Sequence, residues 1–180
     1  MNKLRILILL IVAVVILSTT VIYGADPGPV LNFNDEAEIE EIALPEHDCT
    51  ADWEDGIYTV VSTNESGDGD PYIAYTMDID ADTYTWAKFR IKNLSDCTTF
   101  EFHFNPNNTG IAASSKVHFT MTANDTDWKE YVVNIPEANV ETVNYLVDIS
   151  TGLPSDPPGK IDESLWTGDV DNFRFDFMWY

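Results

Sequence analysis

The chain has 180 residues, which is enough for one domain with a full hydrophobic core and too few for two of ordinary size. It carries 31 acidic and nine basic residues, a formal net charge of −22. A surface this acidic repels the phosphates of nucleic acids and the headgroups of anionic lipids, so we expect no nucleic-acid partner and no docking on a lipid surface. Cations and neutral ligands are favoured, and high solubility is the simpler interpretation of the charge.

The first 25 residues have the pattern of a signal peptide. Lys3 and Arg5 precede an uncharged apolar run over residues 6–17, and the small residues 24–25 offer a cleavage point. The segment is also close to the length of about 20 residues that spans a bilayer, so an uncleaved anchor helix is the alternative. Both alternatives predict a secreted or cell-surface protein that meets a membrane only through this segment. Seven basic and 31 acidic residues follow it, a net charge of −24.

Residues 26–180 are predicted to form one β-domain. Residues 26–29, Asp-Pro-Gly-Pro, have the composition of a stiff linker, and residues 35–50 form an acidic segment without a clear element. A long loop rich in Pro, Gly and Asp is expected at residues 151–169. Strands are predicted where apolar residues alternate with polar ones or where β-branched and aromatic residues cluster between turns, at residues 30–34, 56–62, 72–75, 84–93, 99–105, 116–122, 129–135, 143–149 and 170–180.

The plainest alternation lies at residues 84–104. Apolar and polar side chains alternate in two runs that are separated by a turn at residues 93–97, which predicts an antiparallel hairpin with one apolar and one charged face. The inward positions are Ala87, Phe89, Ile91, Phe100, Phe102 and Phe104. With eight or nine short strands and no convincing long amphipathic helix, the chain is predicted to be an all-β antiparallel sandwich of two sheets.

Two cysteines, Cys49 and Cys97, follow the signal segment. Pairing is the default in an oxidising compartment, and a bridge between them would stabilise the fold by about 4 kcal/mol. Two free, buried thiols are the alternative. Four glycosylation motifs in predicted turns fit an extracellular surface, at Asn64, Asn93, Asn107 and Asn124.

Several short motifs follow one another in an order known from a protein family. They are Asp70-Pro-Tyr-Ile73, Asp78-Ile-Asp-Ala-Asp82, residues 84–93, Thr98-Thr-Phe-Glu-Phe102, residues 117–125, Tyr131-Val-Val-Asn134 and Phe175-Asp-Phe-Met178. Over about residues 30–180 this order resembles the galactose-binding-like jelly-roll modules of the carbohydrate-binding-module type. The resemblance implies a jelly-roll sandwich, often a structural calcium ion and often a sugar site. The calcium ligands that it implies here are Asn34, Asp35 and Asp176.

The side of the predicted sheet that faces away from the core suits a shallow sugar site. Trp86 and Trp128 can stack on the apolar faces of sugar rings while charged groups hydrogen-bond the hydroxyls. The alternative is a solvated sheet face with compensating cross-strand ion pairs. The candidate ligand-binding residues are Trp86, Lys88, Arg90, Glu101, His103, His118, Trp128 and Glu130.

No catalytic arrangement is predicted. The sequence has no Ser-His-Asp pattern, nucleophile elbow, phosphate loop or Cys-X-X-Cys, although a pair of glycosidase carboxylates is an alternative in so acidic a chain. A zinc site made by Glu101, His103 and His118 is a further alternative.

We therefore expect a non-catalytic carbohydrate-binding module with a polysaccharide or glycan as partner. The second hypothesis is a structural or adhesive cell-surface protein that assembles with itself and has no sugar site. It is motivated by the residues Val147-Asp-Ile-Ser150, which stand where the related modules have Arg-X-Asp-Pro.

Overall fold

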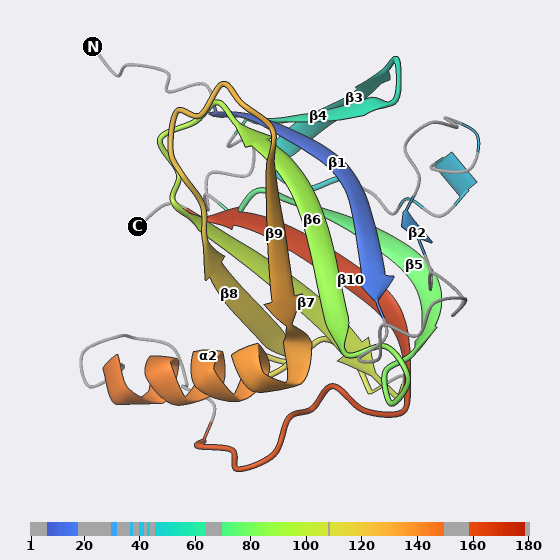
Figure 1. The fold of residues 1–180 in the computed structure, drawn as a ribbon, viewed down its shortest axis with the longest axis vertical. Coiled ribbons are helices and arrows are strands. Elements are labelled where there is room, and N and C mark those ends of the chain that lie inside the picture. Colours follow the sequence, from blue (N-terminus) through green and yellow to red (C-terminus); the bar gives the residue numbers. More distant parts are fainter. Residues whose placement is uncertain are drawn as a thin grey trace.

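The structure, a computed structural model, describes residues 7–17, 30–31, 37, 40–41, 43, 46–63, 70–107, 109–149 and 159–178. Two antiparallel sheets face each other across the core (Figure 1). Sheet A has the order β3 (Cys49–Glu54), β4 (Ile57–Ser62), β1 (Leu7–Leu17), β6 (Trp86–Asn93) and β9 (Lys129–Asn134), with β2 (Val30–Leu31) paired to β1. Sheet B has the order β5 (Tyr72–Asp80), β10 (Asp169–Met178), β7 (Thr99–Pro106) and β8 (Lys116–Thr120). The predicted all-β antiparallel sandwich is confirmed.

The core consists mainly of aromatic rings between the two sheets. The six inward positions predicted on β6 and β7 are all buried, with at most 1% of each residue exposed. From β6, the ring of Phe89 contacts four rings of sheet B, those of Phe100, Phe102, Phe119 and Phe175, at centroid distances of 5.2–6.1 Å. Tilted and edge-on ring pairs at these distances contribute about 0.5–1.5 kcal/mol each beyond the burial of their area.

The predicted hairpin at residues 84–104 is wrong. β6 pairs with β1 and β9 in sheet A, whereas β7 pairs with β10 and β8 in sheet B. The connection between them crosses from one sheet to the other and is held by Asn93, whose Nδ2 donates to Cys97 O at 2.7 Å and to Thr122 O at 3.0 Å. Two strands that face one another across a core alternate in the same way as two neighbours in one sheet, so the pattern could not separate these arrangements.

The strand predicted at residues 143–149 is also wrong, because helix α2 (Ile135–Ile149) occupies this part of the chain. Pro136 lies in the first turn, where its missing N–H costs nothing, and Glu137 complements the positive end of the helix dipole. The buried side of α2 is made by residues at helical spacing, Ile135, Asn139, Thr142 and Val143.

Asn139 joins α2 to its surroundings and is completely buried. Its Nδ2 donates to the carbonyls of Ser114 and Lys116, both at 2.8 Å, and its Oδ1 accepts from Leu165 N at 2.9 Å and from Ser164 Oγ at 3.0 Å. One side chain therefore ties the helix to β8 and to the segment that precedes β10.

Strand β3 was not predicted from the sequence. It forms a hairpin with β4 through a turn at Asp55 and Gly56, whose φ angles are 52° and 75°. Both values lie in the left-handed region that a two-residue hairpin turn of this kind requires. The Asp-Gly pair was the signal in the sequence that could have predicted this hairpin.

Of the predicted long loop, residues 151–158 lie outside the described part, as does the linker at 26–29. In the remainder, Trp166 is buried and its Nε1 donates to Tyr84 O at 2.8 Å.

Strand β1 is the apolar run of the predicted signal or anchor segment. It lies between β4 and β6, with Leu10 opposite Thr59 on one side and opposite Lys92 on the other (Figure 1). Among the described residues, no helix is long and apolar enough to cross a membrane. The prediction that residues 1–25 direct export stays a prediction.

The predicted disulfide is wrong, since Cys49 and Cys97 are both free and buried. Each thiol has its own carbonyl partner: Cys49 Sγ donates to Tyr72 O at 3.2 Å, and Cys97 Sγ donates to Thr99 O at 3.1 Å. Burial raises the pKa of Cys49 to about 12, so this group is a neutral thiol at any physiological pH.

Candidate functional site

The predicted ligand face divides between the two sheets. Because β6 and β7 belong to different sheets, the expectation of one shared face is wrong. Five of the candidate residues lie on or beside the outer surface of sheet A, here called the β6–β9 face: Trp86, Lys88, Arg90, Trp128 and Glu130. The other three lie on the outer surface of sheet B and, with Asp176, form what we call the β7–β10 cluster: Glu101, His103 and His118.

On the β6–β9 face, side chains from neighbouring strands hold one another in place. Arg90 is opposite Glu130 in the register, and its guanidinium lies 5.3 Å from the centroid of the Trp128 ring. Lys88 Nζ is 2.7 Å from Glu130 Oε1. Cation–π contacts at exposed sites contribute about 0.5–1 kcal/mol. This face therefore presents two indole rings and fixed polar groups, with Trp86 next to the edge strand β9.

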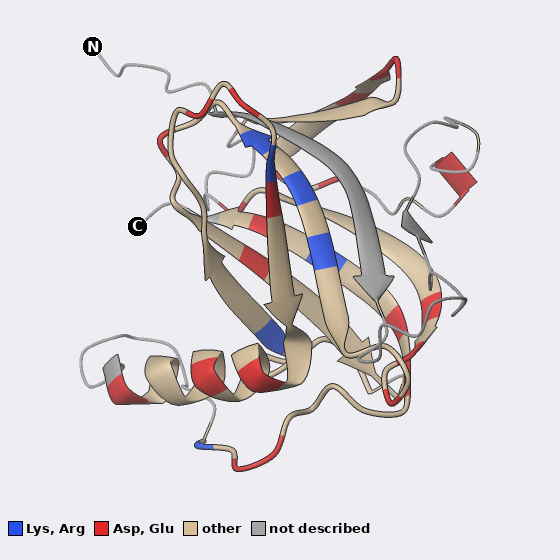
Figure 2. Ribbon diagram, in the orientation of Figure 1, with Lys and Arg blue, Asp and Glu red and all other residues tan. Residues whose placement is uncertain are grey.

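The β6–β9 face is also the basic part of an acidic molecule. Three of the seven basic residues that follow residue 25 occupy alternate outward positions on β6, Lys88, Arg90 and Lys92 (Figure 2). Lys88 is neutralised by Glu130, whereas Arg90 and Lys92 have no carboxylate within ion-pair distance among the residues that the structure describes. At physiological salt, charges more than about 8 Å away are largely screened, so a ligand here meets mainly these cations.

The β7–β10 cluster is buried although it lies on the outer surface of sheet B. Glu101 is 1%, Asp176 is 2% and His103 is 7% exposed. His103 Nε2 lies 2.9 Å from Glu101 Oε2 and 3.3 Å from Asp176 Oδ2. From the next strand, His118 Nε2 contacts Glu101 Oε1. The sequence suggested Glu101, His103 and His118 as an alternative zinc site. It suggested Asp176 only as a calcium ligand, through the family resemblance.

Two basic side chains, Arg174 and Lys116, hydrogen-bond the carboxylates of this cluster. Arg174 holds Asp176 with two hydrogen bonds, from Nε to Oδ1 at 2.6 Å and from Nη2 to Oδ2 at 2.5 Å. Lys116 Nζ donates to Glu101 Oε1 at 3.0 Å and to Oε2 at 3.2 Å.

These contacts set the protonation of the cluster. Burial disfavours ionised Glu101, but hydrogen bonds from both histidines and the charge of Lys116 outweigh it and hold the pKa of Glu101 well below its usual range. Burial likewise disfavours protonated His103, but Asp176 and Glu101 outweigh it and raise the pKa of His103.

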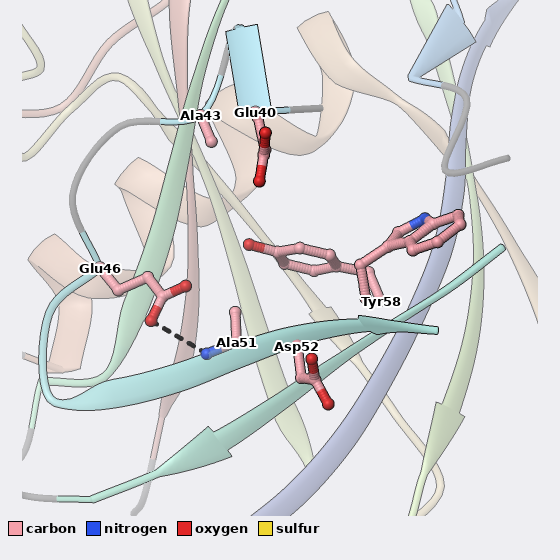
Figure 3. A pocket seen from close by; sticks show the side chains of 7 residues that line it. Glu40, Ala43, Glu46, Ala51, Asp52 and Tyr58 are labelled. Atoms are coloured by element: carbon pink, nitrogen blue, oxygen red, sulfur yellow. Dashed lines mark hydrogen bonds between the residues drawn. The ribbon is translucent and has the colours of Figure 1, made fainter. Parts of the chain in front are cut away.

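A separate hollow of about 300 Å³ lies beside the β3–β4 hairpin (Figure 3). It is lined by three carboxylates and two aromatic rings among its residues, which are Glu40, Ala43, Glu46, Ala51, Asp52, Trp53 and Tyr58. Figure 3 shows the Tyr58 hydroxyl between Glu40 and Glu46. Ala51 N donates to Glu46 Oε2 at 2.9 Å, which ties the preceding segment to β3. None of the residues predicted to bind a ligand lines this hollow.

The remaining predicted site residues are the calcium ligands and the glycosylation sites. Asn34, Asp35 and Asn64 lie outside the described residues, and Asp176 is engaged by Arg174. Asn107 and Asn124 are exposed, each with a φ of 51°. Asn93 is 2% exposed with its amide bonded to two carbonyls, so the expectation of a glycosylated surface position is wrong for this residue.

The chain was compared with protein-family models, with curated proteins and with solved structures. None of them matches it. A function therefore has to be inferred from the two polar surfaces themselves.

Proposed function

We propose that this chain is a non-catalytic glycan-binding β-sandwich, of jelly-roll type and located outside the cell, that binds its ligand on the β6–β9 face. The observation that carries the proposal is the placement of Trp86 and Trp128 beside Lys88 and Arg90 on the outside of one sheet. Sugar rings stack on indoles through their C–H faces while their hydroxyls and carboxylates hydrogen-bond to charged groups.

The charge of this face favours an acidic sugar over a neutral one. Arg90 is held over Trp128 by the cation–π contact, so its guanidinium loses little further freedom on binding a carboxylate. A guanidinium also binds a carboxylate with two parallel hydrogen bonds, which a hydroxyl cannot accept in the same way. We therefore expect polymers that contain uronic acids to bind more tightly than their neutral counterparts.

The test is binding of the purified chain to soluble polysaccharides, neutral and uronate-containing, in affinity gels and by calorimetry. Trp86→Ala and Arg90→Ala are expected to weaken binding at least 10-fold. Tyr145→Ala is the matched control, because this aromatic residue is 60% exposed on α2 and is not part of the β6–β9 face, and it should bind as the wild type does. Binding that survives both substitutions on β6 would contradict the proposal.

A third variant separates the β6–β9 face from the hollow beside the hairpin. Trp53→Ala removes an aromatic wall of the hollow and leaves β6 untouched. Loss of glycan binding in this variant, with normal binding by Trp86→Ala, would place the sugar in the hollow and refute the β6–β9 site.

The second candidate function is adhesion by self-assembly. It is favoured by β9, which is the edge strand of sheet A in the described order, and by Val132 on that strand, which is 56% exposed. An exposed apolar edge strand can pair with a second chain. Val132→Lys should abolish any concentration-dependent association in analytical ultracentrifugation. A wild-type protein that stays monomeric and binds glycans excludes this candidate.

A further inference from the structure

The outer surface of sheet B gathers every histidine of the chain. His103 and His118 belong to the β7–β10 cluster, and His47 lies at the β5 side of the same surface, with its ring stacked on Tyr72 at a centroid distance of 4.8 Å. Tyr72 in turn lies beneath the guanidinium of Arg174, 3.8 Å from its ring centroid. The surface is therefore a continuous polar layer and not a set of separate side chains.

The strand register brings three possible metal ligands to one point, Glu101, His103 and Asp176. Glu101 on β7 is opposite Asp176 on β10 and opposite His118 on β8, so these three residues form one row across the sheet. His103 is two residues from Glu101 and projects from the same side of β7. Ligand atoms of Glu101, His103 and Asp176 all lie within 4.8 Å of one another. His118 contacts Glu101 Oε1 from β8, on the side of β7 opposite to β10, and lies outside this group.

The chemistry of these contacts calls for a cation between the groups. Each Nε2 faces carboxylate oxygens, and an imidazole lone pair directed at an oxygen lone pair is repulsive unless a proton or a metal ion lies between them. His103 Nε2 meets both carboxylates, and either a proton on this nitrogen or a metal ion shared by the three groups satisfies these contacts. In addition, the surface holds three carboxylates, those of Asp70, Glu101 and Asp176, against the two permanent cations Lys116 and Arg174.

We propose that Glu101, His103 and Asp176 bind one divalent transition-metal ion, with zinc as the best fit. One imidazole nitrogen and two carboxylate oxygens form a ligand set that zinc accepts in tetrahedral geometry, with the fourth position open to water. Calcium and magnesium prefer all-oxygen sites with more ligands, so they fit this cluster poorly. Arg174 and Lys116 then act as outer partners that orient the two carboxylates, and they offset the charge that these carboxylates bring to a buried site.

The test uses the full chain without a histidine tag, stripped with EDTA and dialysed. Zinc chloride should bind with 1:1 stoichiometry in calorimetry and raise Tm by about 5–10 °C when the free ion is about 100 times above Kd. Cobalt(II) should give the intense visible absorption bands of a tetrahedral site. Calcium and magnesium at the same concentration should leave Tm unchanged.

Three histidine variants make the test specific. His103→Ala should weaken zinc binding at least about 100-fold, and His118→Ala, which removes a partner of Glu101, should weaken it about 10-fold and serves where loss of the more deeply buried His103 impairs folding. His47→Ala, on the same surface but outside the cluster, should bind zinc as the wild type does. The absence of a Tm shift and of calorimetric heat in the wild type would overturn the proposal, and so would zinc binding that is unchanged in His103→Ala and His118→Ala alike.

Discussion

Replacing Phe89 by alanine tests how the two sheets are packed. Phe89 is 1% exposed and is the β6 side chain whose ring meets four rings of sheet B. Removing a buried phenylalanine ring costs about 3–5 kcal/mol, the sum of lost transfer free energy and the cavity left behind. For a chain of this size, a loss of about 4 kcal/mol lowers Tm by about 8–16 °C.

The measurement is urea unfolding followed by circular dichroism. The midpoint should fall while the m-value stays constant, because the surface exposed on unfolding is nearly the same. Tyr145→Ala, at an exposed site on α2, should change the free energy of unfolding by less than about 0.5 kcal/mol.

A double-mutant cycle makes the test specific for the sandwich. Phe89 and Phe175 lie on different sheets with their ring centroids 6.1 Å apart at 81°. Phe89→Ala and Phe175→Ala should therefore couple by about 0.5–1.5 kcal/mol. A coupling energy of zero, or a cost below about 1 kcal/mol for Phe89→Ala alone, would refute the facing arrangement of β6 and β10.

Two further predictions concern buried polar groups. Asn139→Ala should destabilise the fold by several kcal/mol, at about 1–3 kcal/mol for each buried partner left without its bond, and hydrogen exchange should show earliest loss of protection in α2. Alkaline pH should destabilise the protein through its thiols: burial raises the pKa of Cys49 to about 12 and also raises that of Cys97, whereas an unfolded thiol titrates near about 8.5. Between about pH 9 and 12 the unfolded chain releases the Cys49 proton that the folded chain keeps, so stability falls with rising pH by up to about 1.4 kcal/mol per unit, and Cys97 contributes in the same direction. Cys49→Ala should flatten this dependence in urea titrations at pH 8, 9 and 10, and an unchanged slope would contradict the burial effect.

Which side chains of a strand face the core could be predicted from the sequence, but which strands pair with one another could not. The alternation around Phe89 and Phe102 identified the inward faces of β6 and β7 correctly, because parity depends only on the extended backbone. Which strands pair depends on the path of residues 94–98, and this path is fixed by the two hydrogen bonds of the Asn93 amide. That error merged two surfaces into one proposed ligand face.

Helix α2 shows a second limit. Its β-branched and aromatic residues suggested a strand, while the spacing of Ile135, Asn139 and Val143 carried a helical signal that includes a polar member. A buried asparagine is easily taken for a surface residue, because only the tertiary structure supplies its four partners. The same reasoning explains why the burial of Glu101 and His103 was not foreseen: charged residues count as exposed until their partners on neighbouring strands are known.

The position of β1 makes the predicted signal segment part of the fold. Its residues pair with β4 on one side and β6 on the other, so they are an internal strand of sheet A, and they are also the stretch with the composition of an export leader. A peptidase that cut after residue 25 would remove β1 and leave β4 and β6 without the strand that pairs with both. Their unpaired backbone groups could then hydrogen-bond another extended segment that fits between them. With residues 7–17 in place sheet A is continuous from β4 to β6, so this fold depends on a segment that a signal peptidase would remove.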